Sequence, residues 1–163
     1  AHEKFGVKPD IVALAKGLGG GFPIGACLAT EEVAKGMTPG THGSTYGGNP
    51  LACAVATVAV KEILKQEFLE GVKQKGNYFK IELKNIVKQY PGHLEEVRGE
   101  GLMLGLKCIS KNFNLIEQSR KEKLLVVAGG ENTIRLLPPL NIKINEINQA
   151  LNKLERALSK LEI

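Results

Sequence analysis

The chain has 163 residues, of which 43% are hydrophobic and 24% charged, a balance that allows an ordinary globular core. Aromatic residues make up 5%, and the net charge of +5 comes from lysines dispersed among glutamates. This pattern argues against a nucleic-acid partner, since single-strand binding uses aromatic stacking and basic patches need clustered charge. No apolar stretch approaches the roughly 20 residues of a membrane span, so we expect no membrane partner.

The first predicted element is a short buried strand at residues 11–15 that ends at Lys16. Burial disfavours an ammonium ion, so a lysine at the mouth of such a strand can present a neutral amine that forms an imine (Schiff base) with an aldehyde. The alternative is a surface lysine at a strand end. The glycines that follow fit neither GxGxxG nor GxxxxGK[ST] and favour tight turns beside a bulky ligand. They are Gly17, Gly19, Gly20, Gly21 and Gly25.

The next segments are shorter and rich in glycine. Residues 24–29 are predicted to form a second strand, and residues 30–35 a short helix with Thr30 as its N-cap. Residues 38–48 contain four glycines and a proline, which predicts a loop.

Two long helices are predicted next. Asn49 as N-cap and Pro50 at the first helical position start a helix over residues 50–66, which is apolar around most of its circumference and therefore expected to be buried. A second helix over residues 68–90 has apolar residues at steps of three and four.

The remaining chain alternates short strands and helices. The last helix begins after Asn145, and its apolar residues favour a helix laid on a small sheet over a coiled coil. The predicted strands cover residues 95–98, 102–108, 125–128 and 133–137, and residues 115–123 form a helix.

These elements predict an α/β fold in three parts. Residues 1–49 form part of a larger α/β domain, residues 50–90 are connecting helices, and residues 91–163 form a small α/β domain.

Three polar residues outside the Lys16 segment are candidate ligand-binding residues. Ser44 and Thr45 lie between glycines, which suits anion binding through side-chain and backbone donors, although a capped turn is an equal alternative. Arg135 lies between apolar residues of a predicted strand. It is expected either to clamp a substrate carboxylate or to pair internally with a carboxylate such as Glu31 or Glu100.

Metal chemistry and disulfides are not expected. The three cysteines are far apart, and no Cys/His pair has metal-ligand spacing. We expect Cys27, Cys53 and Cys108 to be buried free thiols, which favour a reducing, cytoplasmic location. His2, His42 and His93 belong to no catalytic pattern.

Three segments carry a resemblance to a known family: residues 9–26 around Lys16, residues 42–50 (HGSTYGGNP) and residues 133–142 (TIRLLPPLNI). In this order they closely resemble class III (ornithine-type) aminotransferases, which use pyridoxal 5′-phosphate (PLP). Within the family, the residues of these segments are most similar to those of the acetylornithine aminotransferases. The resemblance covers nearly the whole chain but only the C-terminal part of such an enzyme.

The resemblance implies PLP-dependent transferase fold type I, with this chain covering the end of the large domain and the small C-terminal domain. It implies that Lys16 binds the cofactor and moves the substrate proton, and that Arg135 contacts a substrate carboxylate. It also implies that Thr45, with Ser44 beside it, reaches the PLP phosphate of a neighbouring subunit in a homodimer.

The implied reaction moves an amino group from N2-acetyl-L-ornithine to the oxo acid 2-oxoglutarate, in arginine biosynthesis. In the family, the aspartate that pairs with the pyridine nitrogen lies before the segment matched by Ala1, so we expect the isolated chain to be inactive. Ornithine, 4-aminobutyrate, succinyldiaminopimelate and glutamate-1-semialdehyde enzymes remain alternatives. A non-catalytic α/β assembly module and a basic anion-binding domain are alternatives from other classes.

Overall fold

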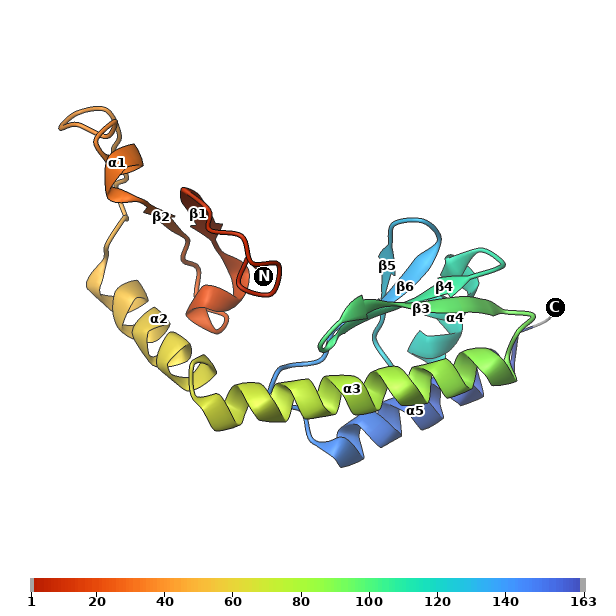
Figure 1. Ribbon diagram of the computed structural model, residues 1–163. Helices are drawn as coiled ribbons and strands as arrows, with labels where there is room; N and C mark the ends of the chain where they lie inside the picture. Colours follow the sequence, from red (N-terminus) through yellow and green to blue (C-terminus); the bar gives the residue numbers. More distant parts are fainter. Residues whose placement is uncertain (1, 162–163) are drawn as a thin grey trace. The chain divides into compact units, whose positions relative to one another are not determined.

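A computed structural model describes residues 2–161 and contains two compact units, Ala1–Phe68 and Leu69–Ile163 (Figure 1). Helix α3, Gln66–Gln89, begins in the first unit and lies mostly in the second. The three-part division expected at residues 49 and 90 stays a prediction.

The first unit contains a two-stranded antiparallel sheet. Strand β1, Ile11–Leu14, pairs with β2, Ala26–Ala29, and the short 3-10 helix η1, Lys16–Gly19, lies between them in the chain. Both strands were predicted, although β2 begins two residues later than expected. Thr30 precedes helix α1, Glu31–Ala34, at the N-cap position as predicted, but its side chain makes no capping hydrogen bond.

The β1–β2 hairpin exposes apolar side chains. Ile11 is 57% exposed and Leu28 56% exposed, so the prediction of a buried strand at residues 11–15 is wrong. Among residues 2–161, β2 is the one strand that pairs with β1. The continuous apolar run of β1 is typical of a strand that is covered on both faces. Residues 2–161 do not cover both faces of this strand.

Helix α2, Pro50–Ile63, begins as predicted. The Asn49 side chain accepts a hydrogen bond from the Ala52 backbone N–H at 2.9 Å, and proline occupies the first turn, where it leaves no broken hydrogen bond. The helix ends at Ile63, earlier than expected. The expectation of a buried helix is wrong, because only Ala52 and Ala56 are buried and Leu51 is 63% exposed.

The second unit is built on a four-stranded antiparallel sheet in the order β3-β4-β6-β5 (Figure 1). The strands span Leu94–Glu100 (β3), Met103–Cys108 (β4), Val127–Gly129 (β5) and Thr133–Leu136 (β6). The predicted strands are therefore confirmed, with ends that differ by one to two residues.

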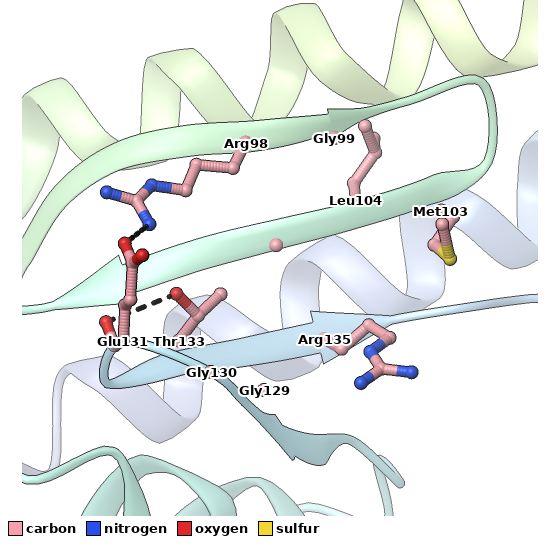
Figure 2. A pocket seen from close by; sticks show the side chains of 10 residues that line it. Arg98, Gly99, Met103, Leu104, Gly129, Gly130, Glu131, Thr133 and Arg135 are labelled. Carbon is pink, nitrogen blue, oxygen red and sulfur yellow. Dashed lines mark hydrogen bonds and ion pairs between the residues drawn. The ribbon is translucent and has the colours of Figure 1, made fainter.

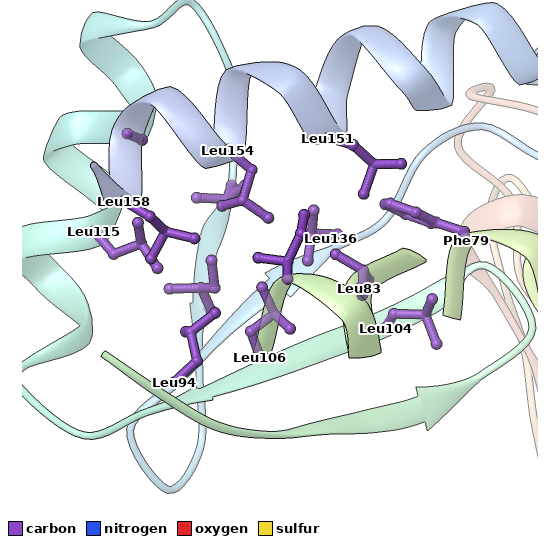
Figure 3. Close-up of a cluster of buried hydrophobic side chains, with 14 of the residues drawn as sticks. Phe79, Leu83, Leu94, Leu104, Leu106, Leu115, Leu136, Leu151, Leu154 and Leu158 are labelled. Atoms are coloured by element: carbon purple, nitrogen blue, oxygen red, sulfur yellow. The ribbon is translucent and has the colours of Figure 1, made fainter. Parts of the chain in front are cut away.

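Helices α3 and α5, Ile144–Leu158, lie on the same face of this sheet (Figures 1 and 3). The apolar seam of α5 packs into the core with the strands, which confirms a helix on a sheet rather than a coiled coil. The larger core side chains drawn in Figure 3 are Phe79, Leu83, Leu94, Leu104, Leu106, Leu115, Leu136, Leu151, Leu154 and Leu158.

Helix α4, Asn112–Lys121, starts three residues before the predicted position. The Asn132 side-chain oxygen accepts a hydrogen bond from the Asn112 backbone N–H at 2.9 Å and so satisfies a free donor of the first turn. The partner lies 20 residues downstream, so the local sequence does not reveal this start.

Helix α3 approaches the β3–β4 hairpin at a glycine pair. A Cβ built on Gly76 would lie 2.7 Å from the Gly101 carbonyl carbon. The Lys80 amine donates a hydrogen bond to the Gly99 carbonyl at 2.9 Å beside this contact. The absence of a side chain at residue 76 therefore sets how closely the helix and the hairpin pack.

We predict that Gly76→Ala destabilises the second unit by about 2 kcal/mol, because the added methyl group forces the helix away from backbone that cannot yield. Gly71→Ala in the same helix has nothing within 4 Å of the new Cβ and should be neutral or stabilising by up to about 1 kcal/mol. Urea unfolding of both variants measures the difference. Equal effects of the two substitutions would contradict the packing argument.

Glu122 connects the end of α4 to the end of α5. Its carboxylate accepts hydrogen bonds from Lys160 and from Arg156 Nε, the latter at 2.8 Å. These bonds, that of Lys160 foremost, hold the pKa of the Glu122 carboxyl below its ordinary value of 4.5. A carboxyl whose pKa is lowered by folding stabilises the fold above its ordinary pKa, and the contribution disappears as pH falls through the folded value.

We therefore predict that Glu122→Gln lowers the unfolding temperature at pH 7 and that this difference shrinks as pH falls below 4.5. Thermal unfolding of wild type and variant across pH measures it. Glu70→Gln is the control, since the exposed Glu70 makes no ion pair among residues 2–161 and should show no pH-dependent difference. A Glu122→Gln defect that persists at low pH would mean that packing, not charge, is responsible.

Within the described chain, none of the helices combines the length and hydrophobicity that crossing a bilayer requires.

Candidate active site

Lys16 is the first residue of η1, separated from the end of β1 by Ala15, and has an uncommon backbone conformation. Its φ is +54°, in the left-handed region that costs a non-glycine residue about 1 kcal/mol or more. The next turn uses the freedom of glycine, with φ of +58° at Gly20 and +115° at Gly21. The expectation that Lys16 lies at the mouth of a buried strand is wrong in this chain. The residue is exposed, and its amine makes no hydrogen bond or ion pair among residues 2–161.

Ser44 and Thr45 lie in the loop that precedes α2, as expected. Both are exposed, and within the described residues neither hydroxyl has a hydrogen-bond partner. The loop is closed by a hydrogen bond from the Gly47 backbone N–H to the Ser44 carbonyl at 3.3 Å. The Asn49 side chain also donates to the Tyr46 carbonyl at 3.0 Å, which agrees with the structural role expected for Asn49.

Arg135 lies on β6 and lines a cleft of about 510 Å³ on the sheet face opposite α3 and α5 (Figure 2). It is exposed, and its guanidinium makes no hydrogen bond or ion pair within residues 2–161. Neither Glu31 nor Glu100 pairs with it there, so the internal-pairing alternative is not found. Other lining residues are Arg98, Gly99, Met103, Leu104, Gly105, Gly129, Gly130, Glu131 and Thr133.

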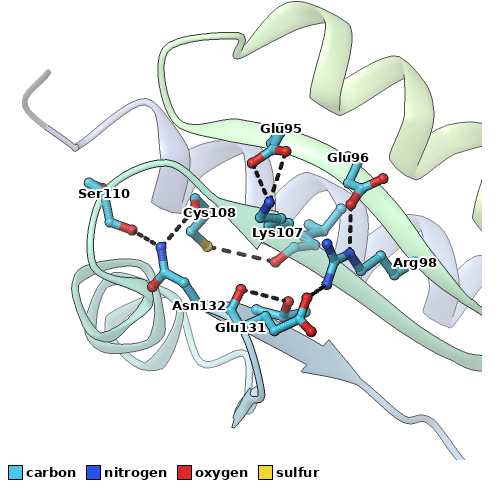
Figure 4. A network of polar contacts seen from close by, with 10 residues as sticks. Glu95, Glu96, Arg98, Lys107, Cys108, Ser110, Glu131 and Asn132 are labelled. Atoms are coloured by element: carbon cyan, nitrogen blue, oxygen red, sulfur yellow. Dashed lines mark hydrogen bonds and ion pairs between the residues drawn. The ribbon is translucent and has the colours of Figure 1, made fainter.

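Two charged residues of this cleft, Arg98 and Glu131, are not predicted by the sequence patterns. Arg98 on β3 donates from Nε to the Glu96 carboxylate at 2.6 Å and from Nη1 to the Glu131 carboxylate (Figures 2 and 4). Glu131 is 33 residues further along the chain. The alternation of the Val-Arg-Gly stretch would have placed Arg98 on the open face of the sheet, but no local pattern indicates its partner.

The turn between β5 and β6 places Glu131 in the cleft. Glu131 and Asn132 both have positive φ, +53° and +58°. The Asn132 side chain holds the turn by donating to the carbonyls of Cys108 at 2.7 Å and Ser110 at 2.8 Å (Figure 4). Its side-chain oxygen also accepts the hydrogen bond from the Asn112 backbone N–H at the start of α4. Three hydrogen bonds of the Asn132 side chain therefore hold this turn.

The four predicted site residues are divided between the units. Lys16, Ser44 and Thr45 belong to the first unit, and Arg135 belongs to the second. Among residues 2–161, no group of three His, Cys, Asp or Glu side chains is placed to hold a metal ion.

Comparison with known families provides the deciding observation. The profile of the family described as aminotransferase class III matches residues 1–158. The chain belongs to the class III aminotransferase family. The match includes Lys16, Ser44, Thr45 and Arg135, and the mixed α/β fold agrees with it.

Relatives in the family show which enzymes the chain is similar to. Acetylornithine aminotransferase from Brucella melitensis is 51% identical over 93% of this chain and 38% of its own length. The crystal structure of acetylornithine aminotransferase from Elizabethkingia anophelis superimposes with a TM-score of 0.89 at 32% identity, over 98% of this chain and 43% of that one.

A third relative is an ornithine aminotransferase from Toxoplasma gondii, whose structure has partial occupancy of PLP at its active site. It superimposes with a TM-score of 0.85 at 30% identity, over 92% of this chain and 36% of that one. The chain thus spans about two fifths of the length of these class III enzymes.

Two substitutions of Asn132 test whether the turn between β5 and β6 requires a left-handed backbone at this residue. Both Asn132→Gly and Asn132→Ala remove three hydrogen bonds, each worth about 1 kcal/mol. Alanine also resists the left-handed backbone, so we predict that Asn132→Ala is the less stable variant by about 1 kcal/mol. Chemical denaturation of the two variants measures this difference. An alanine variant as stable as the glycine variant would show that the turn does not enforce a left-handed backbone.

Proposed function

We propose that this chain is the C-terminal part of a PLP-dependent aminotransferase that transfers the terminal amino group of N2-acetyl-L-ornithine to 2-oxoglutarate, in arginine biosynthesis. The observation that carries the proposal is the 51% identity, over 93% of the chain, to the acetylornithine aminotransferase of Brucella melitensis. The residues proposed for the site all lie within the family match.

The side chains of the first unit fit PLP chemically. Lys16 offers an unpaired primary amine, the group that bonds to an aldehyde, on a backbone whose strain is typical of functional positions. Ser44 and Thr45 offer two unpaired hydroxyls among glycines, which suits the oxygens of a phosphate. When bound, PLP supplies an electron sink for the carbon that carries the transferred amino group.

The residues of the chain then have separate roles. Lys16 would hold the cofactor through its amine and would carry on Nζ the proton that moves between substrate and cofactor. Arg135 binds a substrate carboxylate through the two parallel hydrogen bonds that a guanidinium allows. Thr45, with Ser44 beside it, contacts the cofactor phosphate of the second subunit in a homodimer, so that each site uses both copies.

A reducing compartment, the cytoplasm, is part of the proposal. Cys108 is a buried free thiol, as expected. Cys27 and Cys53 are exposed free thiols, so the expectation of burial is wrong for these two. Burial raises the pKa of the Cys108 thiol, which keeps it protonated and unreactive. Exposed unpaired thiols persist where cellular reductants keep them reduced.

Ornithine is the second candidate amino donor. The likeness to the Toxoplasma gondii ornithine aminotransferase favours it, since the TM-score of 0.85 is close to the 0.89 of the acetylornithine enzyme. The two donors differ only in the acetyl group on the amine that is not transferred.

The labelling of Lys16 tests the proposed chemistry. We predict that incubation with PLP, borohydride reduction and peptide mapping by mass spectrometry place a phosphopyridoxyl group on Lys16. The reaction is run with the chain alone and with the unmatched N-terminal segment of the Brucella melitensis relative added as a separate chain. We expect labelling to concentrate on Lys16 when that segment is present, because it supplies the cover that β1 and α2 lack.

Lys16→Ala should lose the label, whereas Lys8→Arg, a change at a nearby exposed lysine, should keep it. Labelling scattered over surface lysines even with the added segment would reject the aminotransferase proposal and favour a non-catalytic module. Consumption of 2-oxoglutarate with acetylornithine or with ornithine in the complemented sample then identifies the donor.

A further inference from the structure

The cleft of the second unit contains two arginines in one cross-strand row. Arg98 on β3 lies opposite Gly105 on β4, and Gly105 lies opposite Arg135 on β6. Residues directly opposite one another share a sheet face, so the side chains of Arg98 and Arg135 both start from the open face (Figure 2). In the strand register Gly105 lies between them. Two strand spacings put their Cα atoms about 10 Å apart.

Gly105 keeps the floor between the arginines open. A Cβ built there would come 2.6 Å from the Thr133 methyl carbon, so a larger residue would require the Thr133 side chain to move. A short dicarboxylate could therefore span the row if both guanidinium groups were available.

The two arginines are not electrostatically equivalent. The Arg98 guanidinium is bonded to Glu96 and Glu131, whereas that of Arg135 has no partner among residues 2–161. The bond from Arg98 holds the pKa of the Glu131 carboxyl below its ordinary value, so Glu131 stays anionic at neutral pH. Of these two arginines, Arg135 is therefore the one whose positive charge is not paired with a carboxylate among residues 2–161.

Stability does not explain the placement of Glu131. Its side chain is 74% exposed, and exposed ion pairs contribute about 0–1 kcal/mol. Left-handed backbone at Glu131 and Asn132 costs about 1 kcal/mol or more per residue. The three side-chain hydrogen bonds of Asn132 offset this cost and hold the turn. The charge of Glu131 adds little to stability, which points to a role for the charge itself.

We propose that Glu131 is a specificity-determining residue that keeps Arg98 out of carboxylate binding, so that a carboxylate ligand binds at Arg135 alone. The inference rests on the carboxylate role proposed for Arg135 above. Without the Glu131 charge the Nη1 end of Arg98 becomes available while Glu96 still holds Nε, and a five-carbon dicarboxylate gains a second anchoring point.

Arginine side-chain NMR tests this directly on the full chain. The sequence has four arginines, at residues 98, 120, 135 and 156, so ¹⁵N-arginine labelling gives four Nε–Hε signals, each assigned with an Arg→Lys variant. Acetate and glutarate are titrated at constant ionic strength. In the wild type we expect the Arg135 signal to move and the Arg98 signal to stay in place.

In Glu131→Gln we expect the Arg98 signal to respond as well, and glutarate to bind about threefold or more tightly relative to acetate, from one added charge-assisted contact. Adding Arg98→Gln to this variant should remove the gain. Glu117→Gln is the matched control, since it breaks the exposed Glu117–Arg120 pair on α4 with the same charge change away from the cleft. Glu131→Gly, which suits the left-handed backbone, serves if the glutamine variant does not fold.

An Arg98 signal that moves with acetate in the wild type, or that stays in place in both Glu131 variants, would overturn the proposal. An Arg135 signal that never responds, while Arg98 responds only after Glu131 is replaced, would instead refute the carboxylate role of Arg135 and leave the effect of Glu131 on Arg98 standing.

Discussion

The arrangement of the second unit follows from one constraint: among residues 2–161, helices cover only one face of its sheet. Because side chains alternate along a strand, every strand sends one set of residues to α3 and α5 and the other set to the open face. Leu104 and Leu106 on β4, with Ile134 on β6, take the covered side and are almost completely buried. Arg98 and Arg135 take the other side, so the same alternation that builds the core also places the cleft.

Most of the fold was predictable from local patterns. Apolar periodicity identified every long helix, and Asn49 with Pro50 marked the start of α2 correctly. Two features that the sequence did not predict depend on contacts between residues distant in sequence. The start of α4 depends on a hydrogen bond to Asn132, and the pairing of Arg98 depends on Glu131. The residues next to each of these positions in the sequence do not indicate either contact.

The roles of the four candidate site residues stay predictions, and their surroundings differ from those expected from the sequence. The sequences of three segments identify the family, and the family match includes the four candidate residues in them, Lys16, Ser44, Thr45 and Arg135. The apolar run before Lys16 and the apolar residues around most of the circumference of α2 both predict burial. Such runs reflect the environment for which a sequence is suited, and the described residues do not provide that environment to β1 or α2.

The exposed hairpin also bears on how copies of the chain behave together. Within residues 2–161, β1 and β2 pair only with each other, which leaves one unpaired backbone edge on each strand. Edges of this kind next to apolar side chains are templates for strand addition between molecules. A two-stranded sheet is also only marginally stable alone. Association through this hairpin should therefore compete with monomeric behaviour as concentration rises, and the scattered net charge of +5 opposes it only weakly.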